Sequence, residues 1–187
     1  MSKIYLILTL IITACPQSME TNEMKTLEKY LEEIPRFENA RISEQEKFSF
    51  KEYKTFYVYP ENTPPIGRAI FMVKKDHVFP THFKEFFPNL IKELHDSGEL
   101  KDLGILKFSE MFLKIGQQKD AKIIDTEQMA HRYRHNFENR NWTKPRETVT
   151  SNGKRYQFWS IDFSRDKAFY YNIIVDNNGI LEVKEFN

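Results

Sequence analysis

The amino-acid sequence predicts an α+β domain, with helices packed on one face of a mainly antiparallel sheet that ends in a C-terminal strand meander. Apolar residues recur at helical spacing through the first two thirds of the chain, whereas near-alternating apolar and polar residues dominate the last third. Residues 22–187 are numerous enough to form one globular domain with its own core.

Three helical regions are expected, each with an apolar face and a recognisable boundary. The first begins with a cap at Asn22, the second begins at Thr81 with a C-terminal cap at Gly98, and the third begins at Asp125 or Thr126. After Gly98 the helical spacing continues with interruptions from Leu100 to Ile115, with expected joints at Gly104 and Gly116. The third helix is expected to place three residues on one face, which are Met129, Tyr133 and Phe137.

Strands are expected both before the second helix and at the end of the chain. Residues 47–59 mix aromatic and polar side chains, with a break near Glu52, and can pair with a short buried strand at 68–74. The segment from His77 to His82 is expected to be a loop. The C-terminal meander is expected to consist of strands at 147–150, 154–163, 169–175 and 181–186, joined by turns rich in Asn, Asp, Ser and Gly.

Charge is balanced over the whole chain but unevenly distributed along it. The chain has 28 Lys and Arg against 27 Asp and Glu. Between His131 and Arg155 seven cations oppose two carboxylates, whereas between Glu20 and Glu52 nine Glu oppose six cations. A neutral protein lacks the counterion-release drive of a nucleic-acid-binding protein, so nucleic acid is not an expected partner. The cationic segment favours an anionic partner, unless the two regions neutralise each other.

The first fifteen residues have the order of an export signal. Lys3 precedes an apolar run at 4–12, which leads into Ile12-Thr13-Ala14-Cys15 and thus to the only cysteine of the chain. This stretch resembles the lipobox of bacterial lipoprotein precursors, which is an aliphatic residue, a small residue, Gly, Ala or Ser, and then the modified Cys. The run of nine residues is much shorter than the ~20 that a membrane-spanning helix needs.

The resemblance implies that residues 1–14 are a signal peptide, that Cys15 carries the lipid, and that residues 15–21 form a lipidated tether. Removing residues 1–14 leaves 173 residues, with 27 cations against 27 carboxylates and no cysteine after Cys15. The expected location is the bacterial cell envelope, with the membrane as a partner through the N-terminal lipid. Because Pro16 rather than Asp follows Cys15, analogy with enterobacterial lipoproteins favours the outer membrane over the inner one.

The densest group of polar and aromatic residues lies between His131 and Trp142. Its Arg and aromatic side chains suit a protein interface, where these residue types tend to be the energetic anchors. The candidate partner-binding residues are His131, Arg132, Arg134, His135, Arg140 and Trp142. No catalytic residue, metal site or cofactor is assigned, because the zinc-protease pattern, the P-loop, the Gly-x-Ser-x-Gly elbow and the dinucleotide fingerprint do not occur in the sequence.

These observations favour a lipid-anchored, non-catalytic envelope protein that binds a protein partner, such as an immunity or assembly lipoprotein. Two alternatives stay open. His131 and His135 are one helical turn apart and could serve as base or metal ligand of an envelope hydrolase. A curved aromatic sheet could instead enclose an apolar cavity and carry a small ligand.

Overall fold

The computed structural model describes residues 21–50, 52–61, 68–117, 119–137 and 141–186. Four α-helices occur in these ranges: α1 (Asn22–Glu32), α2 (Phe86–Asp96), α3 (Ile105–Met111) and α4 (Glu127–Arg132). Shorter helical turns are η1 (Pro35–Phe37), η2 (Glu46–Phe48), η4 (Glu99–Asp102), the π-helical η5 (Phe112–Gly116) and η6 (Arg134–Asn136). The expected signal peptide, Cys15 and the tether up to residue 20 lie outside the described residues.

The strands form two antiparallel sheets rather than one, and the α+β class is confirmed. The N-terminal sheet has the order β1-β2-β3-β4, with β1 (Arg41–Glu44), β2 (Lys54–Tyr59), β3 (Ala69–Lys74) and β4 (His77–Pro80). The C-terminal sheet has the order β5-β7-β8-β9, with β6 also pairing with β7; its strands are β5 (Ala121–Ile123), β6 (Arg146–Thr150), β7 (Gly153–Asp162), β8 (Lys167–Asp176) and β9 (Leu181–Phe186). The predicted C-terminal meander is confirmed.

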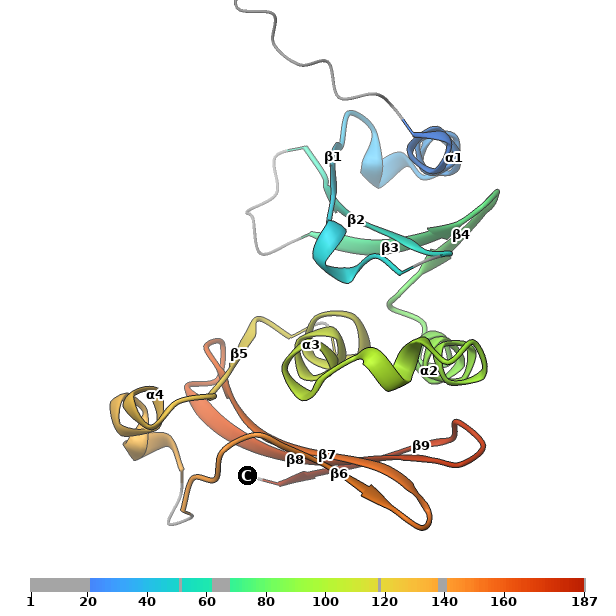
Figure 1. Cartoon of the computed structure of the whole chain (residues 1–187). Helices are drawn as coiled ribbons and strands as arrows, with labels where there is room; N and C mark the ends of the chain where they lie inside the picture. The colour runs from blue at the N-terminus through green and yellow to red at the C-terminus, as the bar shows by residue number, and fades with distance from the viewer. Residues whose placement is uncertain (1–20, 51, 62–67, 118, 138–140, 187) are drawn as a thin grey trace, which may run out of the picture.

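The elements are stacked in layers (Figure 1). Helix α1 covers one face of the N-terminal sheet, and α2 and α3 lie between that sheet and the C-terminal sheet. Helix α4 packs on the face of β7 and β8 that is turned away from α3. Successive side chains of a strand point to opposite faces: in β7, Phe158 packs in the cluster that contains Phe108 of α3, whereas its neighbour Trp159 packs in the cluster beneath α4. In the described part of the chain, no helix is both long enough and apolar enough to cross a membrane.

Aromatic side chains form the central core between the two sheets. The rings of Phe108 from α3 and Tyr156 from β7 stack with their centroids 3.6 Å apart, and both side chains are fully buried. Phe112 packs edge-on against Tyr171 of β8, with 5.2 Å between ring centroids. Each large apolar side chain buried in this way stabilises the fold by roughly 1.5–3 kcal/mol. The inner face of the C-terminal sheet is thus filled by side chains of the helical layer.

The predicted helices and the structure differ mainly at the helix starts. Thr21, not Asn22, caps α1, because its hydroxyl accepts a hydrogen bond from the Met24 amide at 3.3 Å. The second region was expected to start at Thr81, whereas α2 begins at Phe86. Of the two predicted caps of the third helix, Asp125 and Thr126, the structure has Thr126, whose hydroxyl accepts a hydrogen bond from the Met129 amide at 3.2 Å.

Two other helix predictions are confirmed. Gly98 follows α2 with φ of +82°, the left-handed conformation that suits a C-terminal glycine. The three residues predicted to share one face of the third helix, Met129, Tyr133 and Phe137, all belong to the cluster beneath α4.

The strand predictions hold for the longer buried segments and fail for several shorter ones. The expected pairing of the two early strands is confirmed, with Phe56 opposite Phe71. Residues 77–80, expected to be part of a loop, form β4 instead and place Val78 opposite Val73. Within the segment 47–59 the strand β2 covers only Lys54–Tyr59, and η2 (Glu46–Phe48) overlaps the start of the segment. Strands β1 and β5 were not predicted, because segments of only four and three residues are too short for a periodic pattern to be distinguished.

Candidate functional site

The predicted partner-binding residues lie at the edge of the molecule, on and after α4. Arg140 lies outside the described residues. Four of the six occupy the end of α4 and the turn η6 and have exposed side chains, namely His131, Arg132, Arg134 and His135. The structure therefore places these four cationic or titratable side chains together at one solvent-facing end of a short helix.

Trp142 behaves differently from the other predicted residues. Its indole Nε1 donates a hydrogen bond to the Ile124 carbonyl at 3.0 Å, and its half-buried ring packs against the cluster beneath α4. The indole N–H is the only polar group of this side chain, and it is bound within the chain. Trp142 therefore attaches the segment before β6 to the rest of the fold.

Phe163, which follows β7, supplies the exposed aromatic group that sequence reasoning missed. Its side chain is 49% exposed, and its ring meets the Tyr133 ring edge-on with 6.2 Å between centroids. The Arg132 guanidinium lies 5.6 Å from the centroid of Tyr133. We define the α4 surface as His131, Arg132, Tyr133, Arg134, His135 and Phe163.

Asn136 holds the two parts of the α4 surface together. This buried side chain donates from Nδ2 to the Asp166 carbonyl at 2.7 Å and to the Asp166 carboxylate at 3.0 Å. The contact connects η6 to the turn between β7 and β8, on which Phe163 lies. The position of Phe163 relative to the α4 cations therefore depends on a pair of residues thirty positions apart.

Asp162 shapes the same turn. Its buried carboxylate accepts hydrogen bonds from the Ser164 hydroxyl at 2.6 Å and from the Ser164 amide at 3.0 Å. Burial alone would raise the pKa of this carboxyl, but the hydrogen bonds from Ser164 and the nearby Arg165 outweigh burial and lower the pKa below its ordinary value. An ionised Asp162 thus fixes the backbone that follows Phe163.

A groove of about 320 Å³ lies beside the exposed ring of Phe163. Its apolar lining comes from Phe48, Leu113 and Ile123 together with Phe163, and a close ion pair between Lys47 and Glu110 borders it. An exposed aromatic ring next to an apolar groove with charged edges has the composition of a protein interface, in which a buried anchor is surrounded by a polar rim.

His131 and His135 have no ligand set around them in the described part of the chain. No group of three or more His, Cys, Asp or Glu side chains that could hold a metal ion occurs among those residues. Both histidines are exposed on the α4 surface. The hydrolase hypothesis therefore gains no support from this geometry and stays a prediction.

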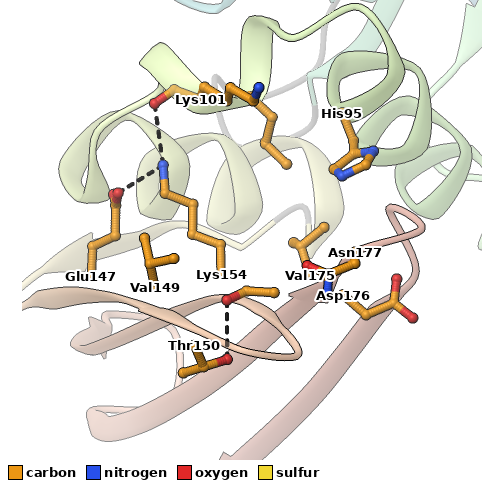
Figure 2. A pocket seen from close by; sticks show the side chains of 11 residues that line it. His95, Lys101, Glu147, Val149, Thr150, Lys154, Val175, Asp176 and Asn177 are labelled. Atoms are coloured by element: carbon orange, nitrogen blue, oxygen red, sulfur yellow. Dashed lines mark hydrogen bonds and ion pairs between the residues drawn. The ribbon is translucent and has the colours of Figure 1, made fainter.

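A second hollow, which we call the hairpin cleft, lies between α2 with η4 and the β6–β7 hairpin (Figure 2). It has a volume of about 420 Å³. Leu100, Val149 and Val175 contribute apolar surface, while His95 and Asp176 lie at the side of the cleft away from Lys154. Its position differs from the sequence-based expectation of a cavity enclosed by the sheet.

The charged wall of the hairpin cleft is built around Lys154. Its Nζ donates to the Glu147 carboxylate at 2.7 Å and to the Lys101 carbonyl at 3.2 Å (Figure 2). Lys154 and Glu147 are both mostly buried. Two of the charges counted between His131 and Arg155 therefore neutralise each other. The exposed cations of this segment include Arg132 and Arg134 on the α4 surface, and Lys144 and Arg146 outside it.

The chain matches no protein-family model, no curated protein and no solved structure. The candidate site consequently rests on the residues and contacts described above.

Proposed function

We propose that this protein is a lipid-anchored, non-catalytic protein of the bacterial cell envelope that binds a protein partner through the α4 surface. One observation carries the proposal: Phe163, half exposed beside an apolar groove, packs against Tyr133, and the Arg132 guanidinium lies near the same Tyr133 ring. Aromatic and Arg side chains contribute most to protein interfaces when a partner removes water from them. An immunity or assembly lipoprotein is the concrete form of this function.

The arrangement of the layers supports this combination of anchor and binding surface. Helix α1 begins shortly after Cys15, whereas the α4 surface lies on the C-terminal sheet, on the other side of the α2 and α3 layer (Figure 1). A lipid at Cys15 would hold the α1 side nearest the membrane. The α4 surface would then face away from the membrane and be open to a partner.

Photo-cross-linking in the native host tests the binding surface. A photoreactive residue is placed at Phe163 or Arg134 of the full chain, with Lys29, exposed on α1, as the matched control position. We expect one discrete cross-linked product from each of the two α4-surface positions and none from Lys29. Equal products from all three positions, or no product from Phe163 and Arg134, would contradict the proposed surface.

The anchor has a separate test. Replacing Cys15 by Ser removes the thiol that receives the diacylglycerol, so palmitate labelling should disappear and the protein should leave the membrane fraction. A neighbouring substitution, Pro16→Ala, is the matched control and should keep the label. Unchanged labelling of the Cys15→Ser variant would refute the lipid anchor while leaving the cross-linking result intact.

A small-ligand carrier is the second candidate, and the apolar lining of the hairpin cleft favours it. Val149, which is 79% exposed, lines the cleft together with Leu100 and Val175. Binding of an apolar fluorescent dye should weaken in Val149→Asp but not in Phe163→Asp, which lies outside the cleft. Equal dye binding by both variants would rule out the cleft as the ligand site.

A further inference from the structure

We infer that two copies of this chain pair through strand β9, antiparallel and centred on Val183, so that their C-terminal sheets become continuous. Among the described residues β9 pairs only with β8, which leaves its other edge at the border of the sheet. The backbone N–H and C=O groups along an edge strand are a template on which a further strand can pair. The inference concerns a surface other than the α4 surface.

Apolar side chains along β9 and the residue before it remain partly open to solvent. Val183 is 38% exposed, Ile180 is 61% exposed and Phe186 is 39% exposed. In the proposed register Val183 lies opposite Val183 of the second copy, and Ile180 lies opposite Phe186. The pairing therefore removes apolar surface from water at the centre and at both ends of the shared strand pair.

The charges of β9 select this register. Glu182 and Lys184 flank Val183, form an ion pair with each other at 2.9 Å, and are both largely exposed. When Val183 faces its own copy, Glu182 lies opposite Lys184 and Lys184 lies opposite Glu182, so each charge also has an opposite charge directly across the strand pair. Opposite charges directly across an antiparallel pair are stabilising, whereas like charges are destabilising.

The neighbouring symmetric registers are unfavourable for the same reason. Shifting the centre to residue 182 places Glu182 against its own copy, and shifting it to residue 184 places Lys184 against its own copy. Charged side chains commonly protect edge strands from pairing. In β9 the opposite signs of Glu182 and Lys184 allow pairing in the register centred on Val183, whereas like charges meet in the registers centred on residues 182 and 184.

The symmetry of the pair also agrees with the layer arrangement. Two antiparallel strands that keep the same face upward are related by a two-fold axis perpendicular to the sheet. Both copies then carry α2, α3 and α1 on the same side of the shared sheet (Figure 1). This step rests on the proposed anchor: two lipids at the α1 side could insert into one membrane without separating the pair.

The strength of the interaction follows from its size. A pair of six-residue strands buries less than the roughly 1,200 Å² of a stable standard interface, so we expect a dimer that depends on concentration. Anchoring both copies in one membrane would raise their effective concentration and favour the dimer.

Disulfide trapping tests the pairing in the full chain. Val183→Cys places two thiols directly opposite each other at a Cβ separation of about 4.5–5.5 Å, and a small approach of the two strands brings this to the roughly 3.5–4.5 Å of a disulfide. We expect mild oxidation to give a covalent dimer, with the bond between the two 183 positions identified by mass spectrometry to distinguish it from bonds to Cys15. Val149→Cys, exposed on β6, is the matched control and should give far less.

Charge exchange in the Val183→Cys background then tests the register. Glu182→Lys or Lys184→Glu alone creates two like-charge pairs and should reduce trapping about tenfold. Combining both substitutions restores opposite charges and should restore trapping. Failure of the combined variant to recover, or Val183→Cys trapping no better than the control, would overturn the inference. Because trapping requires neither a partner protein nor lipid, it can succeed when the proposed function fails.

Discussion

Gly153 illustrates how a single residue determines the β6–β7 hairpin. Its φ is +130°, and a Cβ added there would lie 2.2 Å from the Val175 carbonyl oxygen. A side chain is therefore excluded both by backbone conformation and by the adjacent strand. The hairpin forms the border of the cleft, so this glycine also positions Val149 and Lys154.

Gly153→Ala should lower the free energy of unfolding by roughly 2–4 kcal/mol, because it combines backbone strain with a steric overlap. Chemical denaturation followed by circular dichroism measures the change. Gly104→Ala is the control, since its φ is −58° and nothing lies within 4 Å of an added Cβ. Equal losses in both variants would show that the close approach to Val175 is not the cause.

Asp162 adds a pH dependence at the residue scale. Its pKa in the folded protein lies below the ordinary value of 3.8, so its contribution to stability is fully present above about pH 4. That contribution is lost as the pH falls through the lower folded-state pKa. The ionised carboxylate binds the Ser164 hydroxyl and amide, which favours it over the protonated form.

Asp162→Asn should reduce stability at pH 7 by about 1–3 kcal/mol, because a buried charged acceptor is lost. The difference from the unmodified chain should shrink as the pH is lowered below the ordinary carboxyl range. Unfolding midpoints at pH 7 and at low pH measure both effects. Asp102→Asn, at an exposed position, should change stability by less than about 0.5 kcal/mol, and a pH-independent difference for Asp162→Asn would contradict the assignment.

At the scale of elements, side-chain contacts connect segments that the backbone keeps apart. Glu93 of α2 accepts hydrogen bonds from the Tyr53 hydroxyl at 2.7 Å and from Lys74 of β3 at 2.8 Å, which attaches the helical layer to the N-terminal sheet. Burial and the hydrogen bond to Glu93 raise the pKa of Tyr53 above its ordinary range. Asn136 connects η6 to the β7–β8 turn in a similar way.

Asn136→Ala tests whether binding depends on how the residues of the α4 surface are positioned, because it leaves those residues themselves unchanged. The substitution removes two hydrogen bonds to Asp166 while leaving Arg132 and Phe163 in the chain, and it should cost about 1–3 kcal/mol. We expect cross-linking from Phe163 to fall in this variant although the protein remains folded. His135→Ala, its exposed neighbour, is the control for stability, and unaltered cross-linking in Asn136→Ala would show that the turn does not position Phe163.

At the scale of the whole molecule, the central core joins the two sheets. It contains Met72 of the N-terminal sheet, Phe112 of the helical layer and Phe158 of the C-terminal sheet in one continuous cluster. A shared core of this kind favours cooperative unfolding, because neither sheet can lose its packing without exposing the other.

Phe56→Ala tests this coupling from the far side of the N-terminal sheet. Phe56 is fully buried beneath α1, so the truncation should cost about 3–5 kcal/mol. Both tryptophans, Trp142 and Trp159, lie at the C-terminal sheet and report on its unfolding by fluorescence. The fluorescence and circular dichroism midpoints should shift together. An unshifted tryptophan transition would show that the sheets unfold independently.

Part of the candidate site was predictable and part was not. The cations around α4 are neighbours in sequence, and a short helix keeps them together, so Arg132 and Arg134 could be identified in advance. Phe163 could not be assigned to the same surface, because its proximity to Tyr133 depends on how the β7–β8 turn meets η6. Trp142 was predicted as an interface residue, but its hydrogen bond to the Ile124 carbonyl is a long-range contact that leaves no local pattern.

The sequence by itself determined the α+β class, the C-terminal meander and the caps at Gly98 and Thr126, because local periodicity and backbone preference decide these features. Only the tertiary structure decided that the strands divide into two sheets with helices between them. Strand β5 pairs with β7, which lies far along the chain, whereas β1 and β4 pair with the two sides of the β2–β3 pair, whose two faces are both buried. Pairing and packing between distant segments are collective properties, and no single stretch of residues encodes them.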